Sequence, residues 1–170
     1  ESGTTFFDTA DVYGDGRSER LLGQLRATRK EPFSVATKVG LRLAPHTSEG
    51  YTRNNLAAFI DRSLTNLKVD RIDLLQLHSP PTDVYYRPEI FSFLEDFVRE
   101  GKVALCGASV NRVEEGLKAI EYPIIRSIQI VFNIFRQRPA EILFDEAKRR
   151  GAGILARLPL SSGLLSGKMT

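Results

Sequence analysis

The sequence predicts an α/β fold in which a parallel sheet is covered by helices. Short β-rich apolar runs alternate with longer segments of helical periodicity about six times along the 170 residues. A doubly wound sheet and a barrel are both compatible with this alternation. No GxGxxG fingerprint follows the first strand, because Gly14 and Gly16 lack a third glycine, and its absence favours the barrel.

Six short apolar runs are the predicted strands. They are Thr4–Asp8, Phe33–Lys38, Ile72–Leu77, Val103–Gly107, Ile124–Val131 and Ala152–Ala156. Pro80 and Pro81 stop the third run, since proline fixes its φ angle and has no amide hydrogen to donate. A barrel has eight strand–helix units and typically ~250 residues, so we expect units to be missing from one or both ends.

The segments between these runs carry helix signals. Ser18 is a predicted N-cap, followed by Leu21, Leu22 and Leu25 on one helical face. Pro88 is a predicted first helical residue, a short helix is expected from about Arg112 to Ile120, and Pro139 is expected to open another. The clearest apolar stripe comprises Leu56, Phe59, Ile60, Leu64 and Leu67.

Composition excludes several classes of protein. The net charge is +3, but the basic residues are scattered, and the dense run at 148–150 closes a predicted helix, where it complements the helix dipole. We therefore expect no nucleic-acid partner. No apolar run approaches the ~18 residues of a membrane span. Cys106 is expected to be a buried free thiol, which fits a reducing, cytoplasmic setting.

Polar side chains stand at the ends of successive predicted strands. They are Asp8, Lys38, His78, Ser109 and Gln129, with Tyr13 in the loop after the first strand. In a parallel barrel all these strand ends lie on the same face, where active sites are built. Each residue alone has an ordinary structural explanation, but together they predict a site.

The chemistry of this set indicates proton donation. A tyrosine hydroxyl titrates near ~10, and a nearby ammonium is expected to lower its pKa. Asp8 would keep Lys38 charged and aimed, and His78 could hydrogen-bond a substrate carbonyl. No side chain supplies hydride, so a carbonyl reduction requires a cofactor. His46 lies in a polar loop without ligand spacing, so no metal site is expected, and no serine or cysteine nucleophile pairs with a base.

The motifs resemble those of the aldo-keto reductase superfamily across essentially the whole chain. The segment from Phe6 to Gly14 (FFDTADVYG), continued by Ser18 to Gly23 (SERLLG), is similar to the family signature. The remaining matches are Ala36–Gly40 (ATKVG), Asp70–His78 (DRIDLLQLH) and Gly163–Lys168 (GLLSGK).

The resemblance implies a catalytic tetrad in which Tyr13 is the general acid, Asp8 and Lys38 are its electrostatic partners, and His78 orients the substrate. It also implies that Ser109 and Gln129 hold the nicotinamide carboxamide. Arg157 stands where many members stack a tyrosine on the nicotinamide, and a guanidinium plane can stack too. Leu160 and Ser162 are expected to line the pyrophosphate path. The usual asparagine after the serine is replaced by Val110, and Asn111 comes one position late.

The resemblance further implies a TIM (β/α)8 barrel, of which strands two to seven are present. Residues 1–170 would form one partial barrel domain that lacks the N-terminal strand and the C-terminal units. The family tendency favours NADP, as NADPH rather than NADH, with a small-molecule aldehyde or ketone as substrate. Which carbonyl compound is reduced, and the oligomeric state, are left open.

Three alternatives compete with an active reductase. One is a non-enzymatic NADP-binding regulatory or interaction subunit of the same fold, and a second is an inactive fragment. The third is another barrel enzyme such as a metal-dependent isomerase, which the missing ligand set disfavours.

Overall fold

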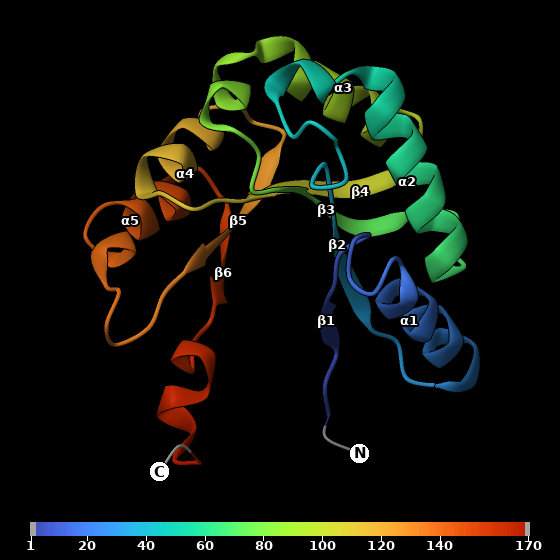
Figure 1. Ribbon diagram of the computed structural model, residues 1–170, viewed down its shortest axis with the longest axis horizontal. Helices are drawn as coiled ribbons and strands as arrows, with labels where there is room; N and C mark the ends of the chain where they lie inside the picture. Colours follow the sequence, from blue (N-terminus) through green and yellow to red (C-terminus); the bar gives the residue numbers. More distant parts are fainter. Residues whose placement is uncertain (1–2, 169–170) are drawn as a thin grey trace.

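A computed structural model describes residues 3–168 of the chain. Six strands form one sheet in chain order, and every neighbouring pair is parallel. In a doubly wound sheet the strand order reverses at a switch point, whereas barrel strands follow one another without reversal. Figure 1 shows the sheet bent into an arch, with β1 and β6 as its two legs. The strands are β1 (Phe6–Asp8), β2 (Ser34–Val39), β3 (Ile72–His78), β4 (Val103–Ser109), β5 (Ile125–Val131) and β6 (Gly153–Arg157).

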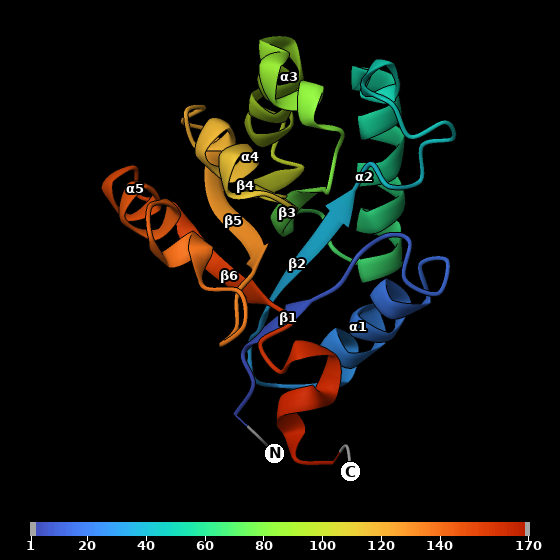
Figure 2. The same ribbon diagram turned by 60° about the vertical axis from the view of Figure 1, so that its left-hand side comes forward.

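The helices lie on the outer side of the arch, as Figures 1 and 2 both show. They are α1 (Arg17–Thr28), α2 (Arg53–Leu67), α3 (Pro88–Arg99), α4 (Val113–Ala119) and α5 (Leu143–Arg149), with short 3-10 turns at 48–50, 82–86, 138–140 and 161–166. A parallel sheet with helices only on its convex side is the arrangement of a (β/α)8 barrel. The predicted fold class is therefore confirmed for an open portion of such a barrel.

The main core fills the space between the sheet and the helices. From α2 it takes the buried side chains of Leu56, Ile60 and Leu67, which confirms the predicted stripe. On the strands β1 and β4, Phe6 and Leu105 are 40% and 50% exposed, so part of the sheet's apolar surface remains uncovered. Cys106 is a buried free thiol, as expected. Within residues 3–168 no helix combines the length and apolar character that crossing a membrane would need.

Some helix starts differ from those predicted. Gly16, with φ 80°, caps α1, and Ser18 lies inside the helix, where its Oγ accepts a hydrogen bond from Thr9 Oγ1 at 2.7 Å. The hydroxyl is therefore engaged by the neighbouring loop, and not by the helix amides. Pro88 is the first residue of α3, as predicted. Pro139 instead lies in a 3-10 turn, and α5 begins only at Leu143.

Candidate active site

Strand register brings three of the predicted polar residues into one row. His78 pairs with Ser109 across β3 and β4, and Ser109 pairs with Gln129 across β4 and β5. All three are buried, and His78 and Ser109 end their strands, whereas the sequence placed both just beyond them. The row lies at the carboxyl ends of parallel strands, where barrel enzymes carry their active sites.

Asp8 and Lys38 form an ion pair at the ends of β1 and β2. The Lys38 Nζ atom lies 2.7 Å from Asp8 Oδ2 and donates a second hydrogen bond to the Thr9 carbonyl at 2.6 Å. The lysine side chain is only 1% exposed, and this burial lowers its pKa below the ordinary 10.5, while the hydrogen bond that it donates to Asp8 opposes the shift. Asp8 therefore favours the charged form of the lysine and fixes its direction.

Tyr13 closes over this pair from the loop between β1 and α1. Its ring meets the His78 ring edge-on, with centroids 5.8 Å apart, and Lys38 Nζ lies 5.4 Å from the Tyr13 ring centroid. Burial, followed by the charge of Asp8, raises the pKa of Tyr13 above 10.0, and Arg157 opposes this shift. The expected lowering of the pKa by lysine is therefore not seen, because the Lys38 ammonium is directed at Asp8 and Thr9 rather than at the phenol.

His78 is a neutral imidazole at physiological pH. Burial first, then the positive charges of Lys38 and Arg157, lower its pKa to about 4. Its Nδ1 atom is buried and has no hydrogen-bond partner among the described residues. A neutral imidazole carries one N–H, which it can donate to an oxygen beside Tyr13.

A chain of hydrogen bonds joins the predicted cofactor residues to the Asp8–Lys38 pair. Ser109 Oγ donates to Gln129 Oε1 at 3.3 Å, and Gln129 Nε2 donates to Asp8 Oδ1 at 3.0 Å. Sequence reasoning did not find this link, because Asp8 and Gln129 are 121 positions apart. Asp8 therefore accepts from lysine with one carboxylate oxygen and from glutamine with the other.

Arg157 extends this chain at the end of β6. Its Nη1 atom donates to Ser109 Oγ at 3.0 Å and to Ser79 Oγ at 3.4 Å, and its Nη2 atom donates to Asn111 Oδ1 at 3.0 Å. The guanidinium thus bridges β3, β4 and β6. Asn111, which the resemblance left without a role, meets the site through this arginine.

An open pocket adjoins these residues. Its volume is about 330 Å³, and its lining is formed by Phe6, Asp8, Gln129, Leu155, Ala156, Arg157 and Leu158. The backbone then turns sharply, with positive φ angles at Leu158, Ser161 and Ser162. Leu160 is 55% exposed, and its carbonyl accepts hydrogen bonds from the amides of Gly163 and Leu165. Leu160 and Ser162 therefore lie in the turn that follows β6, whose last residue is Arg157.

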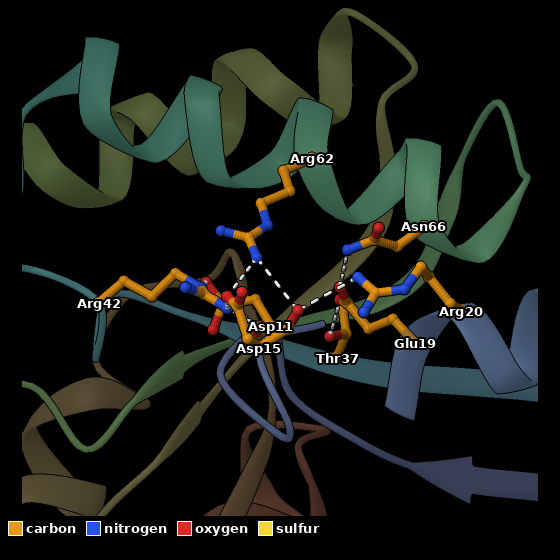
Figure 3. Close-up of polar contacts among 8 residues, drawn as sticks. All are labelled: Asp11, Asp15, Glu19, Arg20, Thr37, Arg42, Arg62 and Asn66. Carbon is orange, nitrogen blue, oxygen red and sulfur yellow. Dashed lines mark hydrogen bonds and ion pairs between the residues drawn. The ribbon is translucent and has the colours of Figure 1, made fainter. Parts of the chain in front are cut away.

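A second polar cluster lies between the Tyr13 loop, β2 and α2, and sequence reasoning missed it. Figure 3 shows Asp11 and Asp15 facing Arg42 and Arg62 there, while Glu19 accepts hydrogen bonds from Thr37 and Asn66. Asp11 and Glu19 are fully buried. The available signal in the sequence was an acid, Asp11, between the apolar residues Ala10 and Val12 directly after the first strand. Carboxylates are almost never fully buried without a partner. No group of three or more His, Cys, Asp or Glu side chains within residues 3–168 could hold a metal.

Comparisons with known proteins agree with this geometry. The sequence model of the Aldo/keto reductase family matches residues 1–170. "Uncharacterized oxidoreductase YqkF" of Bacillus subtilis (strain 168) is 34% identical over 172 residues, covering 99% of this chain and 55% of that protein. The 6-dehydroglucose reductase of Novosphingobium aromaticivorans is 36% identical over 132 residues, covering 72% of this chain and 42% of that protein.

The structure is similar to that of the glycerol dehydrogenase AKR11B4 from Gluconobacter oxydans. The TM-score is 0.83 at 30% sequence identity, over 99% of this chain and 53% of that one. The chain spans about half the length of the relatives it matches. The family match, the parallel arch and the meeting of the strand-end residues lead to one conclusion: this chain belongs to the aldo/keto reductase family, and its six strands are part of that family's (β/α)8 barrel.

Proposed function

We propose that the protein to which this chain belongs reduces aldehyde or ketone carbonyls to alcohols with NADPH. The observation that carries the proposal is the meeting of Asp8, Lys38, Tyr13 and His78 at one rim of the barrel. Asp8, Lys38 and His78 lie at or next to the ends of three different strands, and Tyr13 lies in the loop after β1. We also infer that the chain is one part of a single barrel domain.

The residues present fit a nicotinamide. Ser109 and Gln129 offer a buried hydroxyl and amide in adjacent strands, which is the donor and acceptor set that a carboxamide needs. Arg157 can stack on the ring, and Leu160 and Ser162 would line the path of the pyrophosphate. When bound there, the reduced cofactor supplies the hydride.

The chain's own residues then handle the proton. Tyr13 donates it to the substrate oxygen; the phenol is protonated at neutral pH, and its raised pKa makes it a weaker acid than an ordinary tyrosine. His78 stays neutral, so its N–H can orient the carbonyl oxygen without competing as an acid. Arg157 is the charge that favours the phenolate that remains after transfer, while Lys38, held by Asp8, lies with its Nζ atom 5.4 Å from the Tyr13 ring centroid.

The test uses the complete protein and follows NADPH absorbance with 4-nitrobenzaldehyde as the first substrate. Glyceraldehyde and aldehydo-sugars come next, because two of the relatives are named a glycerol dehydrogenase and a 6-dehydroglucose reductase. Tyr13→Phe is expected to lower turnover by about 10²- to 10⁴-fold, the usual contribution of a general acid. Cofactor affinity, measured by nicotinamide fluorescence, should stay the same.

Tyr86→Phe is the matched control, since this tyrosine is 65% exposed and should leave turnover unaltered. A Tyr13→Phe protein with full turnover would exclude Tyr13 as the acid. Tight NADPH binding by the wild type without reduction of any carbonyl would favour the non-enzymatic subunit, and the proposed reductase would be wrong.

A further inference from the structure

The loop that carries Tyr13 has an unusual backbone. Gly14, Asp15 and Gly16 follow it with φ angles of 56°, 52° and 80°. The left-handed region suits glycine, but it is uncommon for a residue with a side chain, although aspartate is among those that adopt it most readily. A turn of this shape persists when contacts from outside the loop hold it.

Arg42, in the loop after β2, provides such a contact to Asp11, which lies two residues before Tyr13. Its Nε and Nη2 atoms both donate to the carbonyl of Asp11, at 3.2 Å and 2.5 Å. On the other side, the Asp11 amide donates to the carbonyl of Lys38 at 3.2 Å. The backbone of Asp11 is thus bound from both sides, once by Arg42 and once by the lysine of the proposed tetrad.

The charge of Arg42 is matched by two carboxylates of the same loop. Its Nε atom lies 3.4 Å from Oδ2 of Asp11, and its Nη2 atom lies 2.8 Å from Oδ1 of Asp15. Asp11 is fully buried, and neither carboxylate oxygen has a hydrogen-bond partner among the described residues. Burial raises its pKa to about 6, and Arg42 is the largest influence opposing that shift.

Arg62 of α2 contacts only the outer part of this cluster (Figure 3). Its Nη2 atom donates to Oδ1 of Asp15 at 2.6 Å and to the Asp15 carbonyl at 3.3 Å. The Asp15 side chain is 81% exposed, and exposed ion pairs contribute little to stability. Arg42 is 19% exposed and reaches inward to Asp11, so the two arginines differ in what they hold.

We infer that Arg42 is a positioning residue for the reaction, because it fixes the Asp11 backbone and through it the place of the Tyr13 hydroxyl beside His78 and Lys38. This inference rests on the proposed function, in which Tyr13 is the acid. A planar guanidinium can meet one carbonyl and two carboxylates at once, whereas a lysine ammonium has no such fork. A misplacement of about 1 Å in a reacting group can cost on the order of 10²-fold in rate.

The test compares Arg42→Gln and Arg42→Lys with Arg62→Gln in the complete protein. Both Arg42 variants should lose about 10- to 100-fold in kcat. The KM for the carbonyl and the affinity for NADPH should change by less than about threefold, since the residues that would hold the cofactor lie on β4 to β6 and in the turn after β6, outside this loop. Arg62→Gln should alter kcat by less than about threefold, as expected for an exposed pair.

Amide hydrogen exchange of residues 9–18 gives a readout that does not depend on turnover. Exchange should become faster in both Arg42 variants and stay near wild type in Arg62→Gln. If the wild type reduces no carbonyl, the proposed function fails, and exchange alone then decides whether Arg42 holds the loop. If Arg42→Gln does not fold, Arg42→Lys is the deciding variant. The inference would be overturned if the Arg42 variants kept the kcat and the exchange rates of wild type. It would also be overturned if Arg62→Gln lost as much kcat as they do.

Discussion

Gly107, on β4 two residues before Ser109, offers a sharp test of how strand packing positions the cofactor residues. A Cβ atom added there would lie 2.1 Å from Oγ of Ser127 and 2.7 Å from its backbone oxygen, on the neighbouring strand β5. The hydroxyl can rotate away, but the carbonyl belongs to the β4–β5 pair and cannot move alone. Gly107→Ala should therefore push the two strands apart.

Two opposing effects set the change in the free energy of unfolding caused by Gly107→Ala. Overpacking costs about 1–3 kcal/mol. Replacing glycine by alanine returns about 0.4–1 kcal/mol through the unfolded chain. We expect a net loss of about 1–2 kcal/mol in the free energy of unfolding, since the overpacking effect is the larger. NADPH affinity should also fall, because the paired positions Ser109 and Gln129 would be displaced.

The assay is urea unfolding of the complete protein, in which the midpoint should fall while the slope stays constant. Ser127→Ala provides the matched background. Its Oγ atom is buried with no hydrogen-bond partner among the described residues, so the single change should cost less than about 0.5 kcal/mol. In that background Gly107→Ala should cost about half as much, since the 2.1 Å contact with Oγ is removed while those with the backbone oxygen and Cβ of residue 127 remain. A Gly107→Ala protein that is as stable as wild type would refute this reasoning.

Three further predictions concern titration and cofactor binding. The folded-state pKa of Asp11 is raised from 3.8 to about 6, so this group stabilises the fold increasingly as pH falls from 6 to 3.8. Thermal melts should therefore show the stability of wild type rising relative to that of Asp11→Asn over this range. No relative rise would contradict the assignment. The pKa of His78 is lowered from 6.5 to about 4, so the sign reverses, and wild type should lose stability relative to His78→Gln as pH falls through that window. Gln129→Leu removes the amide that lies between Ser109 and Asp8. NADPH binding, measured by nicotinamide fluorescence, should weaken about tenfold, which is the equivalent of one hydrogen bond. An unchanged affinity would show that Gln129 does not contact the cofactor.

The sequence predicted the architecture because its signals are local. Alternating apolar runs located all six strands to within one or two residues, and the stripe on α2 was confirmed by burial of Leu56, Ile60 and Leu67. Strand periodicity and helical spacing act between near neighbours in the chain, so they survive without knowledge of the fold. The meeting of Asp8, Lys38 and His78 at one rim followed from the same logic, since parallel strands end on one face.

Capping and protonation were less predictable. Ser18 looked like an N-cap, yet Thr9 engages its hydroxyl and Gly16 caps the helix. The pKa of Tyr13 was expected to fall, but burial and Asp8 raise it. Both outcomes depend on which neighbour a side chain meets, and spacing along the chain does not determine that.

By itself, the sequence determined the order of strands and helices, the family and the residue types at the strand ends. Only the tertiary structure decided which of these side chains touch. The curvature of the sheet brings Gln129 to Asp8 across 121 positions, and the packing of α2 and the loop after β2 brings Arg62 and Arg42 to the Tyr13 loop. Contacts of this kind depend on how far the sheet bends and how the helices sit on it, and these follow from packing of the whole core rather than from any local segment.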